Sequence, residues 1–131
     1  LMQLGLLEAQ QGRLDEAAAL FARASIADAA NPAPSFNLGL VRQQQGRHAE
    51  ALAAFDAVLG LSPQAAPAHH ARGLALKNLQ RLDEALAAYD AALALQPGFA
   101  AALNNRAAVL LRLGRADDAI ASYRLALEAA P

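Results

Sequence analysis

The chain repeats itself every 34 residues, and this period constrains its fold more than any other feature of the sequence. A small residue recurs at Gly5, Gly39, Gly73 and Ala107. The same spacing, without insertion or deletion, holds for three further series: Arg13, Arg47, Arg81 and Arg115; Phe21, Phe55, Tyr89 and Tyr123; and Pro63, Pro97 and Pro131. A fixed period of this length is typical of proteins built from stacked repeats.

We interpret the chain as a single repeat domain, residues 1–131. The repeats cover residues 1–31, which lack the start of the unit, and residues 32–65, 66–99 and 100–131. Because the first repeat is truncated and the first residue is Leu1, we expect a fragment of a longer chain. The excess of arginine over lysine and the abundance of alanine are typical of a bacterial genome rich in G and C, so we expect a bacterial source.

Each repeat is expected to form two helices. In the third repeat, apolar residues at helical spacing predict helices over Ala68–Leu79 and Leu82–Leu95, with a turn at Gln80-Arg81. The last helix is predicted over Ala116–Ala129. Glycines are expected to mark the same turn elsewhere, at Gly12, Gly46 and Gly114, and acidic residues such as Asp83 and Glu84 open each second helix, where they complement its dipole.

Composition favours helices and excludes several classes of protein. Alanine and leucine dominate, whereas β-branched and aromatic residues are scarce. The 11 Lys and Arg residues nearly balance the 12 Asp and Glu residues, which argues against nucleic-acid binding and against a basic membrane-surface helix. No cysteine is present, so disulfides and cysteine-ligated zinc are excluded. Charges interrupt every long apolar stretch, so no membrane span is expected.

The repeating residues resemble the tetratricopeptide repeat, a family with an aromatic residue, Leu-Gly, Ala, a second aromatic residue and Pro at fixed offsets. Asn37-Leu38-Gly39, Ala51, Phe55 and Pro63 carry the resemblance best. It implies an all-α fold: a right-handed superhelical solenoid of antiparallel helix pairs, with about four repeats and eight helices. The first helix of each pair would line a concave face. The sequence departs from the family where the first aromatic is expected, at Leu1, Ser35, His69 and Leu103.

Residue types that carry catalysis or bind metals do not form a convincing site. Acidic pairs such as Asp117-Asp118 recur at one repeat position, and adjacent residues do not share a helix face. His69 and His70 have no cysteine or carboxylate three or four residues away, and the serines lack a neighbouring base. We therefore predict no enzyme activity, no metal and no cofactor; His48 and His69 are expected to pack, and His70 to face the groove.

The resemblance places partner binding in the concave groove. The positions that line it combine amide, apolar and a few cationic side chains: Phe36, Asn37, Leu40, Gln44, His70, Leu74, Lys77, Asn78, Asn104, Asn105 and Arg112. Amides both donate to and accept from a peptide backbone, and leucine and phenylalanine contact apolar side chains. This lining favours a neutral peptide, extended or helical, over an acidic one.

One binding mode of the family is argued against by the residues. Some members hold the two carboxylates of an acidic tail with a clamp of Lys, Asn and Arg. If the clamp begins in the first repeat, its first two positions hold Met2 and Leu6; if it begins in the second repeat, they hold Phe36 and Leu40. In neither case do the remaining clamp positions hold a cation. Two carboxylates would lack charged partners, so we do not expect such a tail as the partner.

The leading hypothesis is a non-catalytic scaffold that binds a peptide or partner domain in its groove. One alternative is the substrate-presenting repeat region of a larger enzyme, because Arg72-Gly73 and Asn104-Asn105-Arg106 resemble repeats that precede bacterial glycosyltransferases similar to O-GlcNAc transferase. Another is self-assembly into a homo-oligomer through uncapped ends, where Ile120, Tyr123 and Leu127, and Met2 and Leu6, are expected to be bare. We expect a cytoplasmic location, or a periplasmic one if the parent chain carries a signal peptide.

Two arginines stand where the family usually has leucine, and each has an acidic residue at a fixed distance before it. Asp56 precedes Arg72 and Asp90 precedes Arg106, each by 16 residues. Between the first and second repeats, the equivalent two positions hold the uncharged residues Ala22 and Leu38. Because the charges occur in pairs, we predict contacts between adjacent repeats. The alternative is that both arginines project into the groove and bind an acidic ligand.

Overall fold

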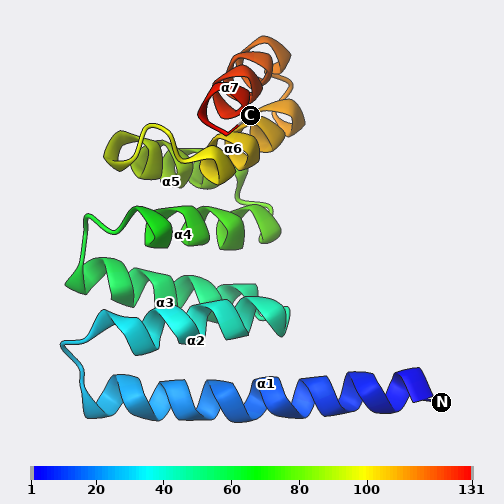
Figure 1. The fold of residues 1–131 in the computed structure, drawn as a ribbon, viewed down its shortest axis with the longest axis vertical. Helices are drawn as coiled ribbons and strands as arrows, with labels where there is room; N and C mark the ends of the chain where they lie inside the picture. The colour runs from blue at the N-terminus through cyan, green and yellow to red at the C-terminus, as the bar shows by residue number, and fades with distance from the viewer. Residues whose placement is uncertain (1, 131) are drawn as a thin grey trace. The chain divides into compact units, whose positions relative to one another are not determined.

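The computed structural model describes the backbone of residues 2–130 and the side chains of residues 10–130, and over this range it is entirely helical apart from turns (Figure 1). The helices are α1 (Met2–Ala27), α2 (Pro32–Gln44), α3 (His48–Leu61), α4 (Ala66–Asn78), α5 (Leu82–Leu95), α6 (Ala100–Arg112) and α7 (Ala116–Ala129). They form two compact units, Leu1–Ser62 and Pro63–Pro131. The predicted bounds of α5 and α7 are confirmed.

The first repeat differs from the prediction of two helices. α1 is one continuous helix of 26 residues that runs through Gly12, so this glycine does not form the predicted turn (Figure 1). A glycine inside a helix costs only about 1 kcal/mol relative to alanine, and folding back is stable only where packing between the two halves compensates for the lost backbone hydrogen bonds. The described residues therefore form seven helices rather than eight.

The equivalent position in the other three repeats does end a helix. Gly46 and Gly114 have positive φ angles of 76° and 77°, and Gln80 has the same conformation with φ 64°. In each turn the next residue closes the helix end; the Arg47 amide, for example, donates to the Arg42 carbonyl at 2.8 Å. At Gln80 the turn keeps this conformation, and the Arg81 amide donates to the Leu76 carbonyl at 2.9 Å, although a non-glycine residue disfavours a positive φ.

Close approach of the two helices in a repeat depends on glycine at the crossing point. In the first unit α2 packs on α3, and in the second α4 packs on α5. A Cβ atom built on Gly39 would lie 2.5 Å from the ring of Phe55, and one built on Gly73 would lie 2.5 Å from the ring of Tyr89. Both aromatic side chains are completely buried, so each ring fills the space beside the glycine where the two helices cross.

The fourth repeat has alanine at this crossing point, and its aromatic residue is not buried. Ala107 is 0% exposed and joins Leu110 and Ala119 in the core between α6 and α7. Tyr123, the counterpart of Tyr89, remains 37% exposed. The glycine repeats have no room for the methyl group of alanine, so Ala107 and Tyr123 are not packed in the same way as Gly73 and Tyr89.

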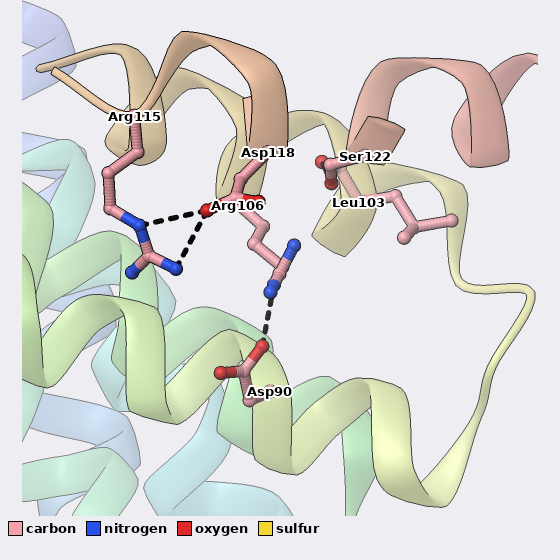
Figure 2. A network of polar contacts seen from close by, with 6 residues as sticks. All are labelled: Asp90, Leu103, Arg106, Arg115, Asp118 and Ser122. Atoms are coloured by element: carbon pink, nitrogen blue, oxygen red, sulfur yellow. Dashed lines mark hydrogen bonds and ion pairs between the residues drawn. The ribbon is translucent and has the colours of Figure 1, made fainter. Parts of the chain in front are cut away.

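Arginine and acidic residues form ion pairs at the start of the second helices. Arg81, which immediately precedes α5, donates from Nε and Nη2 to the Glu84 carboxylate at 3.0 and 2.5 Å. Arg115 makes the same contact with Asp118 before α7, with Nε at 3.0 Å (Figure 2). The carboxylates thus lie in the first turn, as the helix-dipole argument predicts, and the arginines that recur every 34 residues hold them there.

Two polar contacts in the second unit join residues far apart in the sequence (Figure 2). Nε of Arg106 on α6 donates to the Asp90 carboxylate on α5 at 2.6 Å. The buried hydroxyl of Ser122 on α7 donates to the Leu103 carbonyl on α6 at 2.8 Å. The first contact confirms the predicted pairing of Asp90 with Arg106; the equivalent pairing of Asp56 with Arg72 stays a prediction, because these residues belong to different units.

Candidate functional site

The predicted groove residues of the second unit come from α4 and α6, which contact each other although α5 separates them in the sequence. At about 3.6 residues per turn, those on α4 share one side of their helix, and those on α6 share one side of theirs. We call this set the α4–α6 face: His70, Leu74, Lys77, Asn78, Asn104, Asn105 and Arg112.

His70 and Asn105 connect the two helices of this face directly. The Nε2 atom of His70 and the amide nitrogen of Asn105 are 2.8 Å apart. The His70 ring also packs against Phe99, with ring centroids 4.9 Å apart, and against Tyr89, at 5.9 Å. His70 is therefore a half-buried side chain fixed on three sides rather than a mobile residue on the surface.

The environment of His70 favours its neutral form. Burial of the ring, and to a smaller extent the positive charge of Lys77, lower the pKa of His70 below its ordinary value. A neutral ring accepts a hydrogen bond through Nε2, so the contact can be an amide of Asn105 donating to His70. The pKa shift and the hydrogen bond thus stabilise the same protonation state.

The far end of the α4–α6 face is tied together by a second contact. Arg112, on the last turn of α6, donates to the side-chain oxygen of Gln80, which follows α4. Between the two contacts lie Leu74 and Lys77, which are half-buried, while Asn104 is exposed. An apolar side chain, a cation and an amide are thus presented beside a framework of residues that already have partners.

The groove residues of the first unit are arranged differently. Phe36 is half-buried and its ring lies 5.7 Å from that of Phe55. Leu40 is 39% exposed, and Asn37 is exposed. Gln44 borders an open hollow of about 420 Å³ that is also lined by Gln10, Arg13 and Leu14. In this unit the predicted residues present an apolar and amide surface along α2.

Sequence reasoning missed two residues that shape the α4–α6 face. Phe99 lies in the turn before α6 and packs on His70, and Gln80 bonds Arg112 from a turn. Neither occupies a groove position of the repeat, so only the spatial arrangement shows their part. His69, which the sequence predicts to pack, has a ring nitrogen 2.8 Å from the Pro63 carbonyl oxygen.

Neither a metal site nor a membrane span is found in the part of the chain that the structure describes. Among residues 10–130, whose side chains the structure describes, histidine and acidic side chains do not gather in groups of three or more that could hold an ion. None of the helices described over residues 2–130 combines the length and apolar character needed to cross a bilayer.

The family is decided by comparison with known repeats. The profile described as Tetratricopeptide repeat matches residues 2–66 and again residues 70–131. The chain belongs to the tetratricopeptide repeat family. Nearly the whole sequence is therefore made of tetratricopeptide repeat units, as the 34-residue period predicts.

Solved structures of tetratricopeptide repeat proteins show the same fold. A crystal structure of MamA is 22% identical, with 97% of this chain and 74% of that chain covered at a TM-score of 0.85. The crystal structure of YrrB, described as a TPR protein with an unusual peptide-binding site, is 24% identical, with 97% and 66% covered at a TM-score of 0.83. No curated protein matches the chain. The predicted all-α solenoid class is confirmed by these likenesses.

Proposed function

We propose that the protein is a non-catalytic scaffold whose α4–α6 face binds a neutral peptide or an equivalent segment of a partner protein. The observation that carries this proposal is the contact between His70 on α4 and Asn105 on α6, 2.8 Å long, which holds two helices of successive repeats in one surface. Peptide binding in the similar YrrB structure supports the proposal at the level of the fold.

Preorganisation explains how such a face gains affinity. Binding is weakened by the ordering of side chains at the interface, by roughly 0.5–1.5 kcal/mol for each flexible side chain that must be fixed. His70, Asn105 and Arg112 are already held by contacts within the unit. A peptide would therefore encounter a surface with much of this ordering complete.

The chemistry of the face selects a neutral peptide. Leu74 offers apolar surface, and the exposed amide of Asn104 both donates to and accepts from a peptide backbone. Lys77 is half-buried. Removing the remaining water from its charged group costs free energy unless an anion lies close to it. The face carries two cations, and one of them, Arg112, already donates to Gln80, which leaves fewer donors for the two carboxylates of an acidic tail.

A displayed library of random peptides, selected against the whole chain, tests the proposal. Selected peptides are expected to perturb the amide NMR signals of Leu74 and Asn104. The double variant Leu74→Glu with Asn104→Asp is expected to bind at least about tenfold more weakly, because it adds charge to an apolar and amide surface. Asp117→Asn, on the exposed start of α7, is the matched control and should bind normally. Selected peptides that bind the double variant equally well would contradict the proposal.

A further inference from the structure

A second hollow of the first unit is lined mainly by α2 and α3, with one residue from α1, and lies away from the predicted groove residues. Its volume is about 530 Å³ and it is open to solvent. We call it the α2–α3 hollow and define it by its lining: Ser25, Ser35, Leu38, Arg42, Arg47, Glu50, Ala53, Ala54 and Ala57. Most of these side chains are small or apolar, and the charged ones are confined to Arg42, Arg47 and Glu50.

The hollow faces the opposite side of α2 from the groove residues. At about 3.6 residues per turn, Ser35, Leu38 and Arg42 fall on one stripe of α2. Phe36, Leu40 and Gln44 are displaced from that stripe by about half a turn. A molecule bound in the hollow would therefore not occupy the predicted groove face.

Two serines of the lining stand at repeat positions that hold leucine two repeats further along the chain. Ser25 corresponds to Leu93, and Ser35 corresponds to Leu103, each 68 residues further along. Leu103 is only 4% exposed, so in the second unit this position is filled by a large apolar side chain. The hydroxyl of Ser25 is bonded to the Ala22 carbonyl of its own helix at 2.7 Å, so it does not demand a polar ligand.

One edge of the hollow carries an excess of positive charge. The Glu50 carboxylate is shared by Arg42, whose Nε lies 3.2 Å away, and by Arg47, whose nearest nitrogen lies 3.7 Å away. The Arg42 side chain is 22% exposed and the Arg47 side chain 49% exposed. Two guanidinium groups and one carboxylate sum to a net positive charge at this edge, and arginine is well suited to bind a second carboxylate.

We propose that the α2–α3 hollow binds one large apolar side chain of a partner peptide that carries a carboxylate beside it. The apolar side chain takes the volume that leucines fill in the second unit, and the carboxylate pairs with Arg47 and Arg42. This inference goes beyond the proposed function, because it assigns a second site of different chemistry on another face. The hollow is open, so it accepts a single side chain rather than enclosing a whole molecule.

A small aromatic carboxylate tests this site without knowledge of the partner. We would titrate 3-phenylpropionate into the whole chain and follow amide and methyl NMR signals. Saturable shifts at Ser35, Leu38 and Ala53, with a dissociation constant on the order of millimolar for so small a ligand, are the expected result. The uncharged amide, 3-phenylpropanamide, is expected to bind more weakly. Shifts confined to Phe36 and Leu40, or no saturable shift, would overturn the proposal.

Two variants separate the apolar part of the site from the charged part. Ser35→Leu restores the residue found in the fourth repeat and should weaken binding of both compounds by about tenfold or more, because it fills the hollow. Arg47→Gln should weaken binding of the acid and remove its advantage over the amide. Ala94→Leu, an added leucine on the exposed surface of α5, should leave both affinities unchanged. Equal binding by Ser35→Leu and the unmodified chain would refute the site even where Arg47→Gln binds weakly.

Discussion

The carboxylate of Asp90 on α5 and Nε of Arg106 on α6 lie 2.6 Å apart, so this ion pair joins two successive repeats of the second unit (Figure 2). The Arg106 side chain is 25% exposed and that of Asp90 is 52% exposed. The pair is thus partly hydrated, and its strength is closer to that of a surface pair than to the roughly 3–5 kcal/mol of a broken buried pair. Arg106 here stabilises the stack, which agrees with the structural rather than the ligand-binding interpretation of this residue.

Asp90→Ala is expected to lower the free energy of unfolding by about 1 kcal/mol, because it removes the partner of a half-buried guanidinium. Asp117→Ala, at the exposed first turn of α7, should have a smaller effect, since only a helix-dipole interaction of about 0.3–1 kcal/mol is lost. Urea unfolding of the two variants measures the difference. Equal or reversed destabilisation would show that the Asp90–Arg106 pair does not stabilise the stack.

Gly73→Ala should destabilise the second unit by about 1–3 kcal/mol, because the added methyl group would lie 2.5 Å from the Tyr89 ring. Gly60→Ala provides a control of opposite sign. Gly60 lies inside α3 with nothing within 4 Å of its built Cβ, so alanine should stabilise by about 1 kcal/mol. Thermal unfolding followed by circular dichroism tests both, and a stabilising Gly73→Ala would contradict the close-packing account.

Tyr89→Phe is expected to stabilise the chain by about 1 kcal/mol. The Tyr89 hydroxyl is buried without a hydrogen-bond partner among the described residues, and burial raises the pKa of Tyr89 well above its ordinary value. Phenylalanine already occupies the equivalent place at Phe55, so the ring itself fits. A higher midpoint of urea unfolding is the expected result, and a loss of stability would indicate that the hydroxyl does find a partner.

Acidification is expected to weaken the second unit through His70. Its pKa is lowered in the folded chain, so the unfolded chain binds a proton first as the pH falls below 6.5, and stability declines from there through the lower folded pKa. NMR titration of the imidazole gives the folded pKa directly. His70→Gln should reduce this pH dependence of the unfolding midpoint; an unchanged dependence would assign it to other groups.

The outward surface of α7 should promote self-association. Ile120, Tyr123 and Leu127 are 48%, 37% and 66% exposed, as the sequence predicts for an uncovered helix. The corresponding prediction for Met2 and Leu6 concerns side chains outside the described residues. Sedimentation velocity should show association that grows with concentration and is reduced by Ile120→Gln with Leu127→Gln. A monomer at every concentration, with this stripe exposed, would contradict the prediction.

Much of the fold could be predicted because the repeat supplies the same information several times. The small residue at Gly39 and Gly73 and the aromatic at Phe55 and Tyr89 recur at fixed positions, and the structure places each pair in contact where two helices cross. The groove residues were a weaker prediction, since the sequence assigns each to a helix face but not to a neighbour. The structure adds the contact of His70 with Asn105, whereas binding by these residues stays a prediction.

The sequence alone determined the period, the helix pairs and the family, because these depend on local spacing that recurs every 34 residues. Only the tertiary structure shows where a residue departs from the conformation that its repeat position predicts. Gly12 lies within a continuous helix although Gly46 forms a turn at the same repeat position, and Gln80 adopts a positive φ without being glycine. The helix propensities of glycine and other residues differ by only about 1 kcal/mol, which is too little to decide between a helix and a turn. Packing between helices selects the conformation, and no local sequence pattern encodes that packing.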